Sequence, residues 1–510
     1  AMQPLLSTAA VPPALAIDMR QILKRFPGVI ANQQVDFAVQ VGEIHALLGE
    51  NGAGKTTLMN ILCGLYEPDA GEIYLRGQPV RFGRPADAIA AGINMVHQHF
   101  MLVERFTVAE NIVLGQTHGL RRENPKKLHQ RLLALAERYH LELDPAVPVW
   151  QLSVGQQQRV EILKALYRQA KVLILDEPTA VLTPQEAQGL MVILKQLAAQ
   201  GTAIIFISHK LNEVLTLCDR VTVLRDGHLV GTSAIANCTA QQLAEQMVGR
   251  TVDLQRPDRA PTPGSASPRL QLQQVTVPGI HSRPALRQVC LTVCPGEILG
   301  IAGVDGNGQR ELEETVMGLR KLSEGQIHCE GTLAHIPSER YSMGLIRSFT
   351  VAENLLLREI GRPPFTRWGW LRPKAIARYA KDLVDRYLIR TPTLATACGS
   401  LSGGNAQKVV VARELARKPD VILAAQPTRG LDIGAMAYVH AQLMAQRDQG
   451  AAILLISTEL DELLRLSDRI AVLYEGQIVG QMDAATADIQ TLGLMMAGQP
   501  LNPTKQETIA

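Results

Sequence analysis

The chain has 510 residues, a formal net charge of +3 and 46% hydrophobic residues. This length exceeds what one hydrophobic core organises, so we expect two or more globular domains of ordinary composition. The small net charge argues against nucleic acid or an anionic membrane as the main partner. No apolar stretch approaches the roughly 20 residues of a membrane-spanning helix, and the first residues lack the basic start and apolar core of a secretory signal.

The seven cysteines are expected to be reduced thiols. Cys290 and Cys294 are close in the chain, but no second pair accompanies them, so the spacing fits neither a metal site nor a disulfide framework. Free thiols are typical of the cytosol. The other cysteines are Cys63, Cys218, Cys238, Cys329 and Cys398.

The first strong signal along the chain is a glycine-rich loop between a strand and a helix. The apolar run 44–48 predicts a buried strand, and residues 58–62 predict a helix. The loop between them fits the Walker A pattern, in which backbone N–H groups turn towards phosphate oxygens at a helix N-terminus. Lys55 is expected to contact the β- and γ-phosphates, and the Thr56 hydroxyl to bind Mg²⁺. The predicted triphosphate-binding residues are Gly49, Glu50, Asn51, Gly52, Ala53, Gly54, Lys55, Thr56 and Thr57.

Two carboxylates and a histidine follow later strands. The apolar run 172–175 ends in Asp176 and Glu177, and α/β sheets bind ligands at the carboxyl ends of their strands. Asp176 is predicted to hold Mg²⁺, and Glu177 to orient and deprotonate the attacking water. His209 follows the next strand-like run and is predicted to sense the γ-phosphate.

Two further residues are candidates for the same site. Gln98 is neutral and hydrogen-bonding, which suits a residue that bridges metal, water and a mobile subdomain. Phe26 lies upstream of the loop, where it either stacks on adenine or belongs to the core; the sequence leaves both open.

The chain contains a duplicated unit. Segments recur in the same order half a chain apart: 42–44 with 296–298, 107–111 with 350–354, and 152–155 with 401–404. The proline-rich, polar segment 251–268 predicts an exposed linker between the halves. The predicted organisation is an N-terminal extension (1–14), a first domain (15–250), the linker (251–268), a second domain (269–501) and a C-terminal tail (502–510).

Each half alternates strand-like runs with helical stretches, which predicts an α/β core with a largely parallel sheet. Residues 128–141 and 373–388 have helical spacing and fall between the repeated segments. They predict a helical subdomain inserted in each half.

The segments LSVGQQQR (152–159) and LSGGNAQK (401–408) identify a family. Together with the Walker A loop, Gln98, the Asp-Glu pair and His209, they resemble the ATP-binding-cassette ATPases, from about Leu15 to Leu501. The resemblance implies two tandem P-loop NTPase domains, each an α/β, RecA-like core with an inserted helical subdomain. It also implies that two cassettes meet head to tail. Each ATP then lies between one Walker A loop and the other cassette's signature, whose Ser hydroxyl and Gly amides complete the γ-phosphate's shell.

The second half departs from the family pattern at its own nucleotide site. Gln309 and Arg310 replace the Walker lysine and threonine, Ala425 and Gln426 replace the Asp-Glu pair, and Thr458 replaces His209. Losing the lysine ammonium removes a charge-assisted contact. Without lysine, metal ligand and base, this site is predicted to be degenerate.

The two signatures show the converse pattern. The second half keeps Ser402, Gly403, Gly404, Asn405 and Asp432, whereas the first half has Val154 in its signature and Thr183 in place of Asp432. Under head-to-tail pairing, the intact signature serves the complete Walker loop, and the weakened segment Ser153–Gly155 faces the degenerate one. We therefore expect one hydrolytic site per chain.

Phosphoryl chemistry does not say what the energy drives. An importer engine, a soluble ribosome factor and a DNA-repair ATPase stay open, but the short proline-rich linker and the lack of zinc clusters or long coiled coils favour the first. Fused cassettes with a degenerate second half resemble the ATPase subunits of bacterial nucleoside and simple-sugar importers. The segments 97–103 and 425–432 favour a nucleoside or purine-like solute, with a pentose or hexose as the alternative.

The resemblance also implies partners and a location. They are two integral-membrane permease subunits and an extracytoplasmic solute-binding lipoprotein, with one fused chain per transporter and no nucleic acid. The chain is expected at the cytoplasmic face of the inner membrane as a peripheral subunit, with ATP and Mg²⁺ as cofactors. Movement is expected to pass through Gln98 and the helical subdomain, and Ser338-Glu339-Arg340 lacks this glutamine, which predicts asymmetric coupling.

Overall fold

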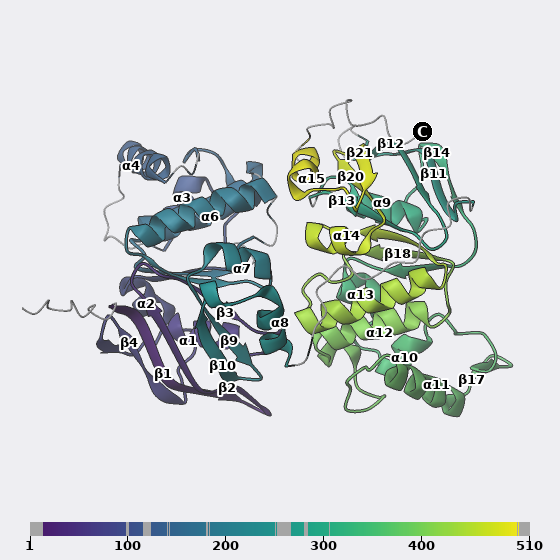
Figure 1. Cartoon of the computed structure of the whole chain (residues 1–510), viewed down its shortest axis with the longest axis horizontal. Coiled ribbons are helices and arrows are strands. Elements are labelled where there is room, and N and C mark those ends of the chain that lie inside the picture. Colours follow the sequence, from purple (N-terminus) through teal and green to yellow (C-terminus); the bar gives the residue numbers. More distant parts are fainter. Residues whose placement is uncertain are drawn as a thin grey trace, which may run out of the picture. The chain divides into compact units, whose positions relative to one another are not determined.

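Figure 1 shows the computed structural model, in which the chain divides into two units, Ala1–Val252 and Asp253–Ala510. The structure describes residues 14–97, 101–115, 124–139, 141, 143–152, 154–179, 182, 184–249, 251, 267–279, 284–304, 306–496 and 498. The division between the units falls inside the predicted linker, most of which lies outside the described residues.

A six-stranded sheet organises the first unit, in the order β10-β9-β3-β8-β7-β6. All its neighbours pair in parallel except β10, which is antiparallel to β9. Every residue of β3 and β8 is buried, because helices cover a parallel sheet on both faces. The strands are β3 (Ile44–Leu48), β6 (Ile93–Val96), β7 (Val172–Asp176), β8 (Ala203–Ile207), β9 (Arg220–Arg225) and β10 (His228–Ala234).

An antiparallel sheet, which the sequence did not predict, packs beside this core. Its order is β2-β1-β4-β5, and the long strands β1 and β2 share an apolar cluster with the core strands and helix α1. The strands are β1 (Leu15–Phe26), β2 (Val29–Gln40), β4 (Ala70–Leu75) and β5 (Gln78–Val80). Its position beside α1 makes it one wall of the glycine-rich loop.

The helices of the first unit fall into two groups. The core carries α1 (Lys55–Leu62), α2 (Pro85–Ala90), α6 (Pro184–Ala199), α7 (Leu211–Leu217) and α8 (Ala240–Val248). The predicted helical subdomain contains α3 (Val108–Val113), α4 (Pro125–Arg138) and α5 (Val154–Tyr167), with η1 (Val149–Gln151) before α5; η2 (Ile235–Asn237) precedes α8.

The second unit repeats this plan. Its main sheet has the matching order β15-β18-β19-β13-β20-β21, and its antiparallel sheet has the order β12-β11-β14. The strands are β11 (Leu270–Val277), β12 (Leu286–Val293), β13 (Ile298–Ala302), β14 (Glu324–Cys329), β15 (Leu333–Ile336), β18 (Val421–Ala425), β19 (Ala452–Ile456), β20 (Arg469–Tyr474) and β21 (Gln477–Asp483). A small hairpin, β16 (Thr366–Arg367) and β17 (Trp370–Leu371), has no counterpart among the described elements of the first unit.

The helices of the second unit follow the same division. The core carries α9 (Gln309–Val316), α13 (Ile433–Asp448), α14 (Leu460–Leu466) and α15 (Ile489–Met496). The helical subdomain contains α10 (Val351–Leu356), α11 (Pro373–Arg386) and α12 (Gly403–Leu415), with the short helices η3 (Arg340–Gly344) and η4 (Cys398–Ser400).

The repeated Thr-Val-Ala-Glu-Asn segment has a local structural role in both units. Thr107 and Thr350 each form a capping box with the glutamate three residues later, which starts α3 and α10. The buried amides of Asn111 and Asn354 each bind both backbone groups of a residue in the preceding loop. The duplication therefore preserves the start of the helical subdomain.

Within the described residues, no helix combines the length and apolar composition needed to cross a bilayer. All seven cysteines are free.

Candidate nucleotide site

The glycine-rich loop lies between β3 and α1, as predicted. Gly54 caps α1 with φ 97°, a left-handed conformation that favours glycine. A Cβ atom at Gly54 would press on the Ala31 carbonyl and lie 2.6 Å from the Asn32 Nδ2 atom. That amide donates a hydrogen bond of 3.1 Å to the Gly54 carbonyl. Strand β2 therefore supports the last residue of the loop before α1.

Lys55 folds back over this loop. Its Nζ atom donates hydrogen bonds to the carbonyls of Gly49 (2.7 Å) and Glu50 (3.0 Å). Thr56 is exposed and Thr57 is half-buried in the first turn of α1. The ammonium group and the threonine hydroxyl thus lie at the helix N-terminus, where phosphate groups bind.

The pKa values of Asp176, which ends β7, and of Glu177, which follows it, shift in opposite directions. Burial and the neighbouring Glu177 charge raise the pKa of Asp176, against the opposing effects of Lys55 and His97. Burial also favours a higher pKa for Glu177, but the hydrogen bond and charge of His209, with the charges of Lys55 and Lys210, outweigh it and lower that pKa. The lowered pKa keeps Glu177 ionised at neutral pH, as a general base requires.

The backbone fixes where Glu177 points. Its φ is 48°, and its N–H donates a 2.8 Å hydrogen bond to the Ile207 carbonyl at the end of β8. The Glu177 Oε1 atom lies 3.0 Å from His209 Nδ1. An ionised carboxylate only accepts hydrogen bonds, so this arrangement places a proton on Nδ1. Strands β7 and β8 thus bring together the predicted base and the predicted γ-phosphate sensor.

The second unit has the same backbone geometry at this position but lacks the carboxylate and the histidine. Gln426 has φ 45°, and its N–H donates a 2.7 Å hydrogen bond to the Ile456 carbonyl. Its Oε1 atom accepts from the Thr458 hydroxyl at 3.3 Å, where the first unit has a histidine and a carboxylate. Ala425 ends β18 with no polar side chain.

The side chains at the lysine and threonine positions of the second unit also have different surroundings from those of the first unit. Gln309 is 6% exposed, and neither atom of its side-chain amide has a hydrogen-bond partner among the described residues. Arg310 is exposed and pairs with Glu314 at 2.9 Å along the same helix. Arg310 therefore does not occupy the place that Lys55 takes over the loop.

The signature residues of the second unit begin α12. The Ser402 hydroxyl caps this helix and accepts a hydrogen bond from the Asn405 N–H. A Cβ atom at Gly404 would lie 3.8 Å from Asp432 Oδ2, so the fold brings the signature and Asp432 together. Asp432 also caps α13 by accepting a 2.7 Å hydrogen bond from the Ala435 N–H. Gly403 shares the first turn of α12.

Other predicted residues have simpler outcomes. Gly155 lies in the first turn of α5, while Gln98, Ser153 and Thr183 lie outside the described residues. Phe26 ends β1, is 37% exposed and makes an edge contact with the Tyr66 ring at 5.5 Å. The core alternative for Phe26 is therefore wrong, and adenine stacking stays a prediction.

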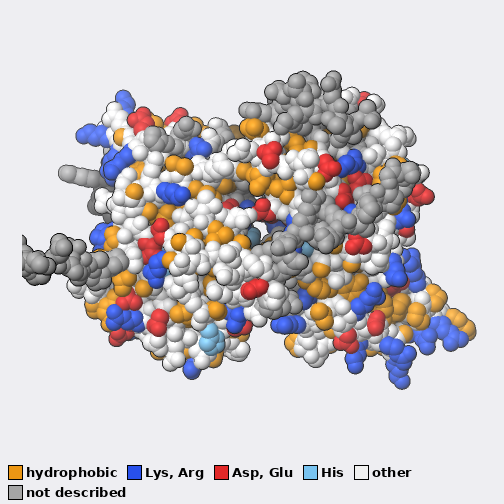
Figure 2. All heavy atoms as spheres, in the orientation of Figure 1, with side chains coloured by type: hydrophobic (Ala, Val, Ile, Leu, Met, Phe, Trp, Pro, Cys, Tyr) orange, Lys and Arg blue, Asp and Glu red, His pale blue; other side chains and the backbone are white. Residues whose placement is uncertain are grey.

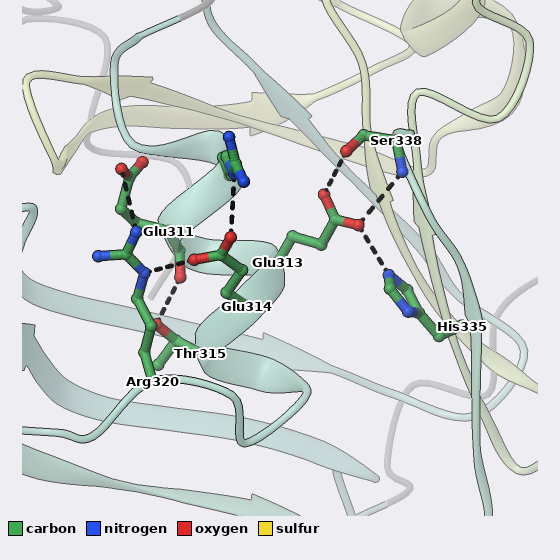
Figure 3. Close-up of polar contacts among 8 residues, drawn as sticks. Glu311, Glu313, Glu314, Thr315, Arg320, His335 and Ser338 are labelled. Atoms are coloured by element: carbon green, nitrogen blue, oxygen red, sulfur yellow. Dashed lines mark hydrogen bonds and ion pairs between the residues drawn. The ribbon is translucent and has the colours of Figure 1, made fainter. Parts of the chain in front are cut away.

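A buried polar network in the second unit was missed from the sequence (Figure 3). Glu313 on α9 accepts hydrogen bonds from His335 Nε2 at 2.8 Å and from the Ser338 hydroxyl at 2.7 Å. Glu313 stands four residues after Gln309, as Met59 stands four after Lys55; likewise His335 and Met95 are the third residues of β15 and β6. The first unit thus has two methionines in one apolar cluster where the second has a buried carboxylate and a histidine.

Arg340 extends this connection to the signature helix. Its Nε atom donates a 2.9 Å hydrogen bond to Gln407 on α12, and its Nη2 atom donates a 2.7 Å hydrogen bond to the Arg429 carbonyl. Gln407 in turn donates to the Pro427 carbonyl at 2.7 Å. Residues 338–340 therefore tie α9 to the start of α12 and to the loop that leads to Asp432.

We expect Glu313→Met to destabilise the second unit by about 1–3 kcal/mol, because it leaves polar groups of His335 and Ser338 without an acceptor in a buried place. The double variant Glu313→Met/His335→Met rebuilds the methionine pair of the first unit and is expected to recover part of this loss. Differential scanning calorimetry of the full chain measures both. A double variant less stable than the single one would contradict the expectation.

The same network has a defined pH dependence. Burial alone would raise the pKa of Glu313, but the hydrogen bonds from His335 and Ser338 hold that pKa below its usual 4.5. A lowered carboxylate pKa adds stability above the unfolded pKa and loses it as the pH falls. The difference in melting temperature between the wild type and Glu313→Gln is therefore expected to be full at neutral pH and to shrink below pH 4.5.

The glycine-rich loop, the paired carboxylates and the parallel sheet define a P-loop ATPase. Sequence comparison matches residues 32–180 and 286–429 to the family described as "ABC transporter". The chain is 47% identical over 497 residues to the guanosine import ATP-binding protein NupO of Bacillus subtilis (strain 168), covering 94% of this chain and 97% of that protein. It is 44% identical to the nucleoside import ATP-binding protein NupA of Lactococcus lactis subsp. cremoris, covering 95% and 99%.

The chain is also similar to a further relative and to a solved structure. The chain is 44% identical to the glucose import ATP-binding protein TsgD13 of Haloferax volcanii, covering 94% of this chain and 95% of that protein. A crystal structure of the archaeal ribosome recycling factor aABCE1 with the ribosomal stalk protein aP1 covers 91% of this chain and 90% of that chain, with a TM-score of 0.63 and 20% identity. This second likeness shows the fold alone.

The chain belongs to the ABC transporter family. This assignment confirms the predicted fold class of two tandem cassettes and the prediction that the chain is an ATP-binding ATPase subunit of a transporter.

Proposed function

We propose that the chain couples ATP hydrolysis to the import of nucleosides or related purine-like solutes. The observation that carries the proposal is the 47% identity, over 94% of the chain, to a protein named for guanosine import. The 44% identity to a protein named for glucose import keeps a simple-sugar importer as the second candidate. The proposed location is the cytoplasmic face of the membrane, where the chain docks on two permease subunits that receive solute from a binding protein.

Hydrolysis is assigned to the first unit. N–H groups of the glycine-rich loop and the Lys55 ammonium bind the phosphates, Glu177 orients the attacking water and takes its proton, and His209 holds the Glu177 carboxylate in place. Ser402, Gly404 and Asn405 of the second unit's signature are proposed to complete the γ-phosphate's shell, and Phe26 to stack on adenine.

The residues present fit Mg²⁺. Thr56, Asp176 and Gln98 would hold it, because this ion prefers oxygen ligands and one or two carboxylates, with phosphate oxygens completing its shell. Among the described residues, no group of three or more His, Cys, Asp or Glu side chains forms a metal cage. The ion would neutralise charge on the phosphates.

Two cavities support permease docking on the helical subdomains. One of about 230 Å³ in the first unit is lined by His97, Met101 and Lys164, and one of about 320 Å³ in the second unit by His335, Met343 and Arg358. Both lie where the core strands meet the signature helix. Crosslinking from residues 100–105 to a permease tests this docking, and no crosslink in any nucleotide state would contradict it.

Uptake of labelled guanosine, ribose and glucose tests the solute. Cells lacking the chain should regain guanosine uptake when the wild type is returned, and should not when Glu177→Gln is returned, because that variant keeps the fold without the base. Restored ribose or glucose uptake without guanosine uptake would select the sugar candidate. Restoration of none of the three would reject both.

A further inference from the structure

The β16–β17 hairpin presents two tryptophans to solvent. Trp368 is 90% exposed and Trp370 is 81% exposed, although tryptophan is usually among the most covered side chains. The hairpin lies in the connection from α10 to α11, which spans residues 357–372; the matching connection in the first unit, 114–124, is five residues shorter and contains no tryptophan.

This exposure belongs to an ordered turn. Phe365 at the base of the hairpin is buried, and its ring lies 4.8 Å from that of Tyr379 on α11. The Arg372 N–H donates a 2.8 Å hydrogen bond to the Phe365 carbonyl, and the Gly361 N–H donates to the Thr366 hydroxyl at 3.1 Å. The base is therefore fixed to the helical subdomain while both indole rings stand clear of it.

Basic side chains predominate in the hairpin and at the start of α11. Residues 360–381 contain six cationic side chains and no Asp or Glu, and none of the six forms an ion pair within the described chain; they are Arg362, Arg367, Arg372, Lys374, Arg378 and Lys381. Acidic residues stand directly at both ends of this segment: Glu359, which pairs with Arg417, and Asp382. Figure 2 shows Lys, Arg and hydrophobic side chains gathered at the lower right, where Figure 1 places β17 and α11.

We propose that this hairpin binds the anionic phospholipid surface of the membrane, with Trp368 and Trp370 in the headgroup layer. Tryptophan favours this layer because its ring is apolar and its N–H is polar. A basic cluster beside an apolar anchor supplies the two attractions that stable surface binding needs. The net charge of +3 for the whole chain conceals this local concentration.

Charge complementarity favours lipid over a permease loop. Cytoplasmic loops of membrane proteins are enriched in Lys and Arg, so they would repel a basic hairpin, whereas anionic headgroups attract it. The inference rests on the proposed function only in that a membrane transporter brings the chain to a bilayer. Its effect would be to orient the second unit's helical subdomain at the membrane.

Tryptophan fluorescence of the full chain tests lipid contact directly. The chain has three tryptophans, so Trp150→Phe leaves only Trp368 and Trp370 as reporters. Their emission should shift to the blue with vesicles of phosphatidylcholine containing about one-third phosphatidylglycerol, and should not shift with phosphatidylcholine alone. Absence of the shift with anionic vesicles would overturn the proposal.

Vesicle co-sedimentation assigns the binding to the hairpin. Trp368→Ser/Trp370→Ser and, separately, Arg367→Gln/Arg372→Gln/Lys374→Gln should each lower binding to anionic vesicles by about tenfold. The matched control Trp150→Ser removes a 63% exposed tryptophan of the first unit and should leave binding unchanged. The lipid assignment would be overturned if the double tryptophan variant bound anionic vesicles as well as the wild type does. It would also be overturned if the hairpin were needed only for binding to neutral vesicles that contain the permease. Solute uptake is a separate readout, so failure here and failure of the proposed import function are distinguishable.

Discussion

Glu177→Gln is expected to lower the ATPase rate of the full chain by about 10²–10⁴-fold, because it removes the group that accepts the proton of the attacking water. Glutamine keeps the size of the side chain and an oxygen that accepts from His209, so binding of ATP is expected to persist. The second unit already shows this substitution: Gln426 has φ 45° against 48° for Glu177, with the same hydrogen bond to the neighbouring strand.

The matched reverse change is Gln426→Glu. It restores a carboxylate beside Thr458, but Ala425 and Gln309 still lack the metal ligand and the ammonium group, so no gain in ATPase is expected. Phosphate release at saturating ATP measures both variants, with binding of a fluorescent ATP analogue as the control for folding. Activity of Glu177→Gln within a few-fold of wild type, or a rise with Gln426→Glu, would show that the catalytic unit has been assigned wrongly.

The sequence predicted what depends on neighbours in the chain. The strand, glycine loop and helix around Lys55 are contiguous, so the spacing alone predicts a phosphate-binding turn at a helix N-terminus. The order of apolar runs likewise predicts the parallel sheet, and the repeated segments predict two similar units. In each case the physical cause acts over a few residues or recurs along the chain.

Contacts between distant segments were not predictable in this way. Asn32 supports Gly54 from 22 residues away, and no local pattern marks it. In the antiparallel sheet of the first unit, bulges shift the register of β1 against both β2 and β4. This pairing therefore does not follow from the alternation of apolar residues alone. The pairing of Glu313 with His335 requires knowing that α9 lies beside β15, although comparing the two halves would have shown that methionines occupy both positions in the first. The basic charge of the β16–β17 hairpin was missed because the net charge of +3 is a sum over the whole chain.

Ser402→Arg is expected to lower ATPase activity by about 10²–10³-fold, because it replaces a hydroxyl proposed to contact the γ-phosphate with a bulky side chain. Ser402 is exposed at the start of α12, so the arginine meets no packed core. The matching change in the other signature, Ser153→Arg, is expected to leave the rate within about twofold, since that signature is proposed to face the degenerate loop. Phosphate release by the two full-length variants measures the contrast.

Loss of the helix cap is the competing explanation for an effect of Ser402→Arg. Replacing a capping serine costs about 1 kcal/mol, which lowers the melting temperature but does not by itself remove a catalytic contact. Ser402→Thr keeps a hydroxyl that can cap α12 and should retain most activity, and Ser402→Ala, which loses the cap without added bulk, separates the two causes by melting temperature. Equal losses from Ser402→Arg and Ser153→Arg would mean that both signatures serve hydrolysis. A larger loss from Ser153→Arg would mean that each unit uses its own signature, and the head-to-tail arrangement would then be wrong.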